Sequence, residues 1–243
     1  MKHRKSDSRL NRTRTLDVSL AQDPRNELYR MQTVLPSKAE LKSKRWPCKF
    51  RLDQGAEGAC VGFAGAHKYG ASPDPQFVST STALRFYHGA QLHDEWTGEQ
   101  YEGTSVTGLM RWLKSQGACQ EYRWIRTAEE LVATIALHGP VIVGCEWREG
   151  CFTPDSNGLI QFIGAVRGGH ATCWDEVDFE RQRFGIIQSW GKGHGINGRV
   201  YMSFADVDLL LRTNPSIVLP AKLKLTLPKP KPTKRSRWWQ FWK

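Results

Sequence analysis

The sequence has no run of 18 apolar residues, so no segment is predicted to cross a membrane as a helix. Its first thirty residues are basic and polar, without the apolar stretch of a secretory signal, and we therefore expect a cytoplasmic protein. Cysteine is also sparse, because six residues in a chain of 243 do not make the dense framework of a disulfide-stabilised protein. The thiols are expected to be mostly reduced.

Acidic residues are missing from one end of the chain. Residues 209–243 hold nine Lys or Arg and no Asp or Glu, and residues 1–51 also have a net charge of +9. Residues 52–208 are acidic, with a net charge of −7. A protein that bound nucleic acid over its whole face would not be acidic in its centre. The positive charge therefore belongs to two flanking segments, and the chemistry is expected between them.

The composition, 40% hydrophobic and 24% charged, allows a sizeable core. We predict a disordered basic arm over residues 1–30, one folded domain over 31–215, and a Pro/Lys linker with a basic aromatic tail over 216–243. The tail would suit an anionic membrane, a nucleic acid or a protein groove, or it could pack back onto the body. Its aromatic and basic residues are Trp238, Trp239, Phe241 and Trp242 with Lys234, Arg235 and Arg237.

The pattern of apolar residues changes in the middle of the chain. Helical spacing and capping residues predict helices over 60–70, 79–92, 105–115 and 127–138. Short β-rich runs then predict strands over 141–147, 159–163, 170–179, 184–190 and 199–204. Helices followed by an antiparallel sheet indicate an α+β fold of two packed lobes.

Cys60 is the one cysteine that is predicted to open a helix. A thiol at the first turn of a helix ionises more readily than usual, and nucleophilic catalysis by cysteine requires the thiolate. Gln54 precedes it in a glycine-rich turn, and its side-chain amide could join the Cys60 backbone N–H in an oxyanion hole. The other five cysteines are interpreted as small buried apolar residues.

Further motifs follow Cys60 in the sequence. In order, they are Gln54-Gly55, Gly58-Ala59-Cys60, Gly168-Gly169-His170, Gln188-Ser189-Trp190-Gly191 and Asn197-Gly198. Their order, with the change from helices to strands, resembles the papain-like cysteine proteases over residues 33–205. The resemblance implies a helical N-terminal lobe and an antiparallel β-sheet or barrel C-terminal lobe, with an active-site cleft between them.

The resemblance also implies roles for single residues in a cysteine-type peptidase. Cys60 would be the nucleophile, and His170 would be the base that later protonates the leaving amine. Gln54 would donate to the oxyanion, Gln188 would orient the imidazole, and Trp190 would shield this partner of the imidazole from water. The substrate would be a peptide or protein, no cofactor or metal ion is implied, and we expect a monomer.

The chain departs from the family pattern at several positions. Gln188 stands where the family has Asn and is one methylene longer, while Glu57 and Val61 replace a frequent Cys and Trp. Residues 102–104 match the glycine-rich segment that binds the substrate backbone only through Gly103. The stretch before Gln54 is too short and too polar for the family's inhibitory propeptide, so control is expected to lie elsewhere.

Three other interpretations stay open at this point. The chain could be a catalytically impaired papain-like scaffold that binds a membrane or nucleic acid through its tail. It could keep the Cys–His pair and act on another acyl group, as amidases do. A zinc site is disfavoured because the spacing lacks a C-x2-C knuckle; its ligands would be Cys145, Cys151, His170 and Cys173. The remaining histidines are interpreted as solvated or packed.

Overall fold

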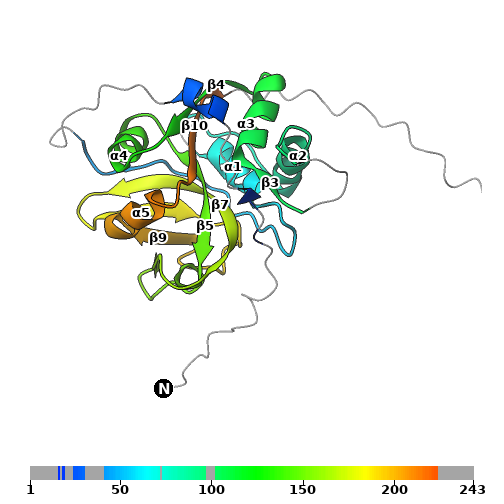
Figure 1. Cartoon of the computed structure of the whole chain (residues 1–243). Helices are drawn as coiled ribbons and strands as arrows, with labels where there is room; N and C mark the ends of the chain where they lie inside the picture. Colours follow the sequence, from blue (N-terminus) through cyan, green and yellow to red (C-terminus); the bar gives the residue numbers. More distant parts are fainter. Residues whose placement is uncertain are drawn as a thin grey trace, which may run out of the picture.

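The structure is a computed structural model, and it describes residues 16, 18–19, 24–30, 41–71, 73–96 and 102–223. The aromatic tail predicted for residues 228–243 lies outside the described residues, as does most of the basic arm. Three helices form one side of the molecule (Figure 1): α1 (Cys60–Gly70), α2 (Thr80–Gln91) and α3 (Val106–Ser115). All three confirm helices predicted from the sequence.

Small residues explain why α1 can lie at the centre of this lobe. Every residue of α1 is buried, so the helix is covered on all sides. A methyl group on Gly62 would collide with the carbonyl oxygen of Ala83, which means that α2 packs directly against the α1 backbone. The neighbouring helices begin at side-chain caps: Ser79 forms a capping box with Thr82, and Ser105 accepts from the backbone of Gly108.

A mixed sheet forms the second lobe, in the order β4-β10-β5-β7-β8-β9-β6. All neighbours pair antiparallel except β9 and β6, and β2 (Lys44–Arg45) pairs with β7 outside this path. Helices α4 (Ala128–Leu137) and α5 (Phe204–Leu211) pack against this lobe (Figure 1). The strands are β4 (Cys119–Ile125), β5 (Val141–Arg148), β6 (Leu159–Ile160), β7 (Val166–Asp178), β8 (Arg183–Ile187), β9 (Arg199–Ser203) and β10 (Ser216–Leu223).

The C-terminal domain boundary lies further on than predicted. Residues 216–223 were predicted to start a linker, but they form β10, which lies between β4 and β5 in the sheet. The proline pattern was misleading because Pro220 lies beyond the part of β10 that pairs with β5. Its missing N–H therefore removes no bond on that side. Strand β4 and helix α5 were not predicted.

The N-terminal boundary also differs from the prediction. Val18–Ser19 form β1, which pairs in parallel with β3 (Thr104–Ser105). Residues Pro24–Tyr29 form a 3-10 helix, η1. The ring of Tyr29 stacks on Tyr122 with centroids 4.9 Å apart, and Asn26 Nδ2 donates to Thr107 Oγ1 at 3.2 Å. These contacts hold part of the predicted arm on the domain. The prediction rested on the basic charge of residues 1–30, which gave no sign that Asn26 and Tyr29 pack against the domain.

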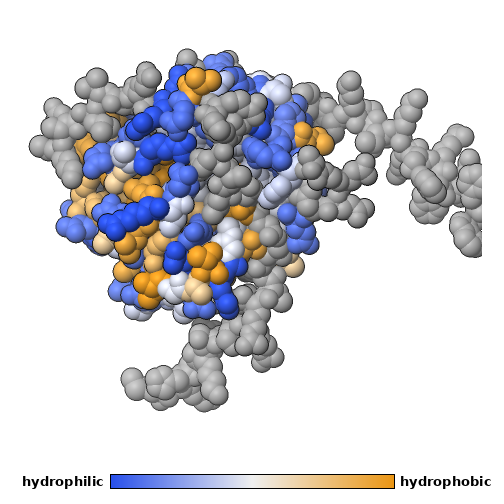
Figure 2. All heavy atoms as spheres, in the orientation of Figure 1, coloured by the Kyte–Doolittle hydropathy of each residue, from blue (hydrophilic) through white to orange (hydrophobic). Residues whose placement is uncertain are grey.

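Two large apolar clusters and a small third one, around Cys48 and Cys173, make up the core of the described residues. One large cluster joins α1, α2 and α3, and the other lies between the sheet and helices α4 and α5. Figure 2 shows hydrophilic residues over much of the visible face, with apolar residues gathered over the sheet lobe. Within the described part of the chain, no helix has the length and apolar character needed to span a bilayer.

Candidate active site

His170 and Gln188 meet between neighbouring strands of the sheet. His170 lies in β7, and Gln188 directly follows β8, which pairs with β7. The ring Nε2 of His170 lies 2.9 Å from Gln188 Oε1. An amide oxygen only accepts, so Nε2 carries the proton in this bond and Nδ1 is the basic nitrogen of the neutral ring. The extra methylene of Gln188, compared with Asn, therefore does not prevent the bond that orients the imidazole.

Two tryptophans enclose the imidazole. Trp190 stacks on the ring with centroids 4.9 Å apart and an interplanar angle of 26°, and Trp147 meets it edge-on at 4.8 Å. His170 and Gln188 are fully buried, so water does not compete for their hydrogen bond. Two rings, and not Trp190 alone, therefore lie against the imidazole. Trp147 was missed, because its contact with His170 depends on the register between β5 and β7.

Cys60 is the first residue of α1, as predicted, and α1 packs against β7 and β5. In β5, Cys145 is the register partner of His170. The pKa of Cys145 is raised well above its usual value, mainly by burial and in part by the nearby charges of Cys151, Glu146 and Cys60. Cys60 and Ala171, the residue that follows His170 in β7, belong to the same apolar cluster.

The other cysteines are poor nucleophiles. None of the six forms a disulfide. Burial raises the pKa of Cys48 and Cys173, and it raises the pKa of Cys119 and Cys151 to about 11. At neutral pH these four side chains are therefore protonated and unreactive as nucleophiles. This agrees with the interpretation of them as small apolar residues.

Gln54 is fixed by the turn before α1 and by the segment after Gln188. Its Nε2 donates to the Glu57 carbonyl oxygen at 2.7 Å, and its Oε1 accepts from Ser189 Oγ at 2.5 Å. The backbone N–H of Gln54 also donates to the Ser189 carbonyl oxygen at 2.8 Å. Ser189 was not singled out from the sequence, yet it joins the turn that contains Gln54 to the segment that contains Gln188 and Trp190.

His67 connects the same turn to α1. The side chain is buried, and its Nε2 accepts a hydrogen bond from the Leu52 backbone N–H at 3.1 Å. Burial, together with the nearby charge of Arg51, lowers the pKa of His67 to about 3. The neutral ring therefore holds the segment that leads into Gln54.

The low pKa of His67 predicts a loss of stability in acid. The unfolded chain binds this proton near pH 6.5 and the folded chain near pH 3, so the contribution is complete above pH 6.5 and is lost as pH falls towards 3. At pH 5 the loss is about 2 kcal/mol. His67→Gln keeps an acceptor without the titration. In chemical denaturation at pH 7.5 and pH 5, we expect a smaller loss for this variant than for the wild type; equal losses would contradict the assignment.

Residues 102–104 match the family's substrate-binding segment only through Gly103, and they lie just before α3. Thr104 and Ser105 form β3 and are both buried, and β3 pairs with Val18 and Ser19 of β1. The side chain of Thr104 donates to Asp94 Oδ2 at 2.6 Å. This short strand therefore already binds an extended segment of backbone, although that segment belongs to the same chain.

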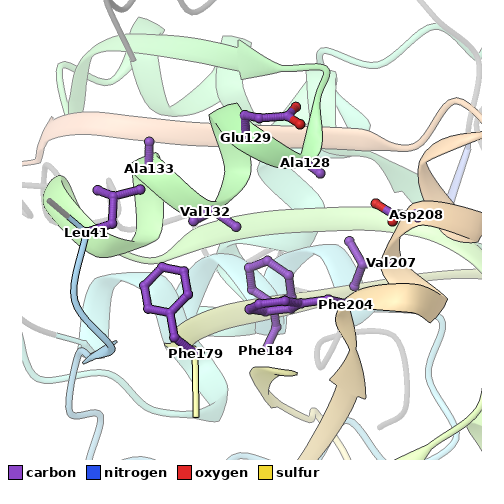
Figure 3. A pocket seen from close by; sticks show the side chains of 10 residues that line it. All are labelled: Leu41, Ala128, Glu129, Val132, Ala133, Phe179, Phe184, Phe204, Val207 and Asp208. Atoms are coloured by element: carbon purple, nitrogen blue, oxygen red, sulfur yellow. The ribbon is translucent and has the colours of Figure 1, made fainter. Parts of the chain in front are cut away.

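A separate cavity lies in the sheet lobe, and none of the predicted site residues lines it. It has a volume of about 290 Å³ and lies beside helices α4 and α5. Figure 3 shows Phe179, Phe184 and Phe204 together on one side, with Val132 across from them. Within the described ranges, no group of three or more His, Cys, Asp or Glu side chains could hold a metal ion.

The fold is similar to those of several solved protein structures. A cysteine protease from Xylella fastidiosa, xylellain, aligns with a TM-score of 0.65 and 18% identity over 87% of this chain and 97% of the other. A procathepsin B from Trypanosoma congolense aligns with a TM-score of 0.55 and 10% identity over 84% of this chain and 86% of the other. A digestive procathepsin L 3 of Tenebrio molitor aligns with a TM-score of 0.55 and 13% identity over 79% of this chain and 74% of the other.

The fold of this chain is therefore that of the papain-like cysteine proteases, which confirms the predicted α+β, two-lobe architecture. Comparisons that use the sequence alone find no match among family models or curated proteins.

Proposed function

We propose that the chain is a cysteine-type peptidase that cleaves peptide or protein substrates at Cys60. The observation that supports this most directly is the buried His170 ring, bonded to Gln188 and enclosed by Trp147 and Trp190. Such a ring has a fixed tautomer with Nδ1 as its basic atom. It lies in a strand against which α1 packs, on a fold shared with cysteine proteases.

The reaction assigned to the site is acyl transfer. The Cys60 sulfur attacks the scissile carbonyl carbon, and its proton passes to Nδ1 of His170. The tetrahedral intermediate collapses to a thioester as the imidazolium protonates the leaving amine. Water, deprotonated by the same ring, then hydrolyses the thioester and restores the thiol. Gln188 holds the ring in one tautomer through the cycle.

Gln54 is proposed as the side-chain donor of the oxyanion hole, with the backbone N–H of Cys60 as the second donor. A preorganised donor is worth more than a mobile one because it costs no reorganisation during the reaction. The bonds of Gln54 to Glu57 and Ser189 fix the plane of its amide. The amide nitrogen has two hydrogens, and the Glu57 carbonyl takes one of them.

The proposal is tested by covalent labelling of the reduced protein. A peptide with a thiol-reactive electrophile should modify Cys60 first, because the high pKa values of Cys119 and Cys151 keep those thiols protonated. Peptide mapping by mass spectrometry identifies the modified residue. Modification of Cys119 or Cys173 ahead of Cys60 would contradict the proposed nucleophile.

We also propose, from the sequence, that the basic aromatic tail binds an anionic surface. Indole rings beside cations favour the interface of an anionic membrane. Removal of residues 228–243 should abolish salt-sensitive binding to vesicles that contain anionic lipid and leave peptide cleavage unchanged. Duplex DNA serves as the second arm, and binding to DNA but not to vesicles would replace the membrane by a nucleic acid. Vesicle binding that survives the deletion would exclude the tail as the binding segment.

A further inference from the structure

The cavity beside α4 and α5 has an aromatic wall. Phe184 lies in β8, Phe204 is the first residue of α5, and Phe179 directly follows β7. The ring of Phe204 has its centroid 6.2 Å from that of Phe179 and 5.0 Å from that of Phe184. Val132 of α4 faces these rings (Figure 3). The cavity, here called the phenylalanine pocket, therefore suits an aromatic or bulky apolar group.

The phenylalanine pocket connects the core of the sheet lobe with the surface. Phe184 and Val207 are buried members of the large apolar cluster of this lobe. Val132, Phe179 and Phe204 pack against that cluster and are partly exposed. The volume of about 290 Å³ is close to the lower end of the range for ligand pockets. An apolar surface with a polar rim is typical of an interaction site.

Two carboxylates form the polar rim of the phenylalanine pocket. Glu129 belongs to the first turn of α4 and Asp208 to α5, and both residues are exposed. Figure 3 shows both on the far side of the pocket from Phe179. Among the described residues, neither carboxylate forms an ion pair or a hydrogen bond. The pocket therefore fits an occupant that combines aromatic rings with positive charge.

The C-terminal tail of the same chain has this chemistry. Residues 234–243 hold four Lys or Arg, four aromatic residues and no Asp or Glu. Trp238 and Trp239 directly follow Arg237, so a ring and a guanidinium lie side by side in the sequence. The charge of the tail is opposite to that of Glu129 and Asp208, which favours its encounter with the pocket.

The chain after β10 is long enough to bring the tail to the pocket. Leu219 of β10 belongs to the same apolar cluster as Phe184, so the strand starts close to the pocket. β10 ends at Leu223, and Trp238 follows 15 steps later in the chain. At roughly 3.3 Å per step an extended chain spans about 50 Å, more than the ~40 Å diameter of a domain of this size. A tether of this length gives the tail a local concentration in the millimolar range, so even weak docking would be populated.

We propose that the phenylalanine pocket is the docking site for the C-terminal tail of the same chain. One tryptophan of residues 238–242 lies among the phenylalanine rings, and neighbouring Lys or Arg side chains pair with Glu129 and Asp208. The same rings cannot lie in the pocket and in a membrane at once, so docking holds the tail back until an anionic surface competes for it. The docking stands without the proposed binding to an anionic surface, whereas this regulatory effect rests on it.

Trypsin cleavage of the full chain measures the docking. Trypsin cleaves after Lys234, Arg235 and Arg237, and mass spectrometry reports the loss of the aromatic end. Val132→Trp fills the pocket with an indole of the domain itself. Leu137→Trp is the matched control, because it lies in the same helix, outside the pocket lining, and is 49% exposed. We expect at least about tenfold faster cleavage for Val132→Trp and the wild-type rate for Leu137→Trp, because cleavage follows the undocked fraction. Equal rates in wild type and Val132→Trp would overturn the proposal.

Asp208→Lys gives an independent check if Val132→Trp does not fold, because Asp208 is exposed and its replacement leaves the core intact. The new cation repels the basic tail. Asp74→Lys is the matched control, since Asp74 is an exposed carboxylate between α1 and α2. We expect tail cleavage to become at least about threefold faster for Asp208→Lys, in line with the loss of an exposed ion pair. The same rate in both variants would contradict the role of the acidic rim.

Dilution identifies the chain that supplies the tail. Protection by the tail of the same chain does not depend on protein concentration. Protection that disappears on about hundredfold dilution would assign the pocket to the tail of a second copy and overturn the proposal.

Cosedimentation with anionic vesicles separates the two proposals for the tail. Val132→Trp should bind the vesicles more tightly than the wild type, because its tail no longer has the pocket. Faster cleavage of Val132→Trp without vesicle binding by either protein would support docking and contradict the anionic surface. Equal cleavage with equal vesicle binding would support the anionic surface and contradict docking.

Discussion

Replacement of Cys60 by alanine is expected to lower kcat/KM for peptide hydrolysis by at least about a thousandfold. The variant keeps the fold, because alanine fits where a small buried side chain stood, but it has no atom that can form the thioester. Cys60→Ser should lose nearly as much, since a hydroxyl ionises far less readily than a thiol. The measurement is the hydrolysis of a fluorogenic peptide by purified protein under reducing conditions.

Cys119→Ala is the matched control for this experiment. Cys119 is also buried, and its sulfur donates to the Glu121 carbonyl oxygen at 2.9 Å, far along the chain from the motifs of the site. Burial raises its pKa to about 11. Activity should stay within a few-fold of wild type. If Cys60→Ala kept its activity within tenfold, the peptidase assignment would fail and the impaired scaffold would become the better interpretation.

Replacement of Arg199 by methionine is expected to cost about 3–5 kcal/mol of folding free energy. Arg199, at the start of β9, donates to Asp175 and to Glu176 of β7 at 2.7 Å each. Burial alone would lower the pKa of Arg199, but the two carboxylates raise it above its usual value. Without the guanidinium, Asp175 stays in a site with no solvent exposure and loses its charged partner.

The effect is measured by urea denaturation of the wild type and the variant. Arg167→Met is the control, because the Arg167–Glu149 pair is 3.7 Å apart and both side chains are more than half exposed. Such surface pairs contribute about 0–1 kcal/mol. Asp175→Asn combined with Arg199→Met should be less destabilised than Arg199→Met alone. A loss below about 1 kcal/mol for Arg199→Met would show that Asp175 is solvated or protonated without its partner.

The local elements were predictable where short-range chemistry decides them. The helix at 127–138 was predicted from Thr127 and Glu130, and in the structure these two side chains form the capping box of α4. The strand at 141–147 was recognised from its β-branched run and corresponds to β5. Local patterns failed for β10, because its partners β4 and β5 are distant in the sequence and Pro220 suggested a linker.

The candidate site was only partly visible in the sequence. Cys60, His170, Gln188 and Gln54 stand in recognisable motifs, and the structure brings His170 to Gln188 and holds Gln54 through Ser189. The assignment of their catalytic roles stays a prediction. Trp147 could not be identified as part of the site, since its contact with His170 depends on the β5–β7 register.

By itself, the sequence determined the helices, most of the strands and the motifs around Cys60 and His170, because caps, turns and side-chain periodicity act over a few residues. Only the tertiary structure decided that Leu16 and Val18 lie against Gly168 and Gly169, and that β10 completes the sheet. Both contacts join residues more than seventy positions apart. Their stability comes from buried apolar surface and backbone pairing that exist only after the two lobes have packed together.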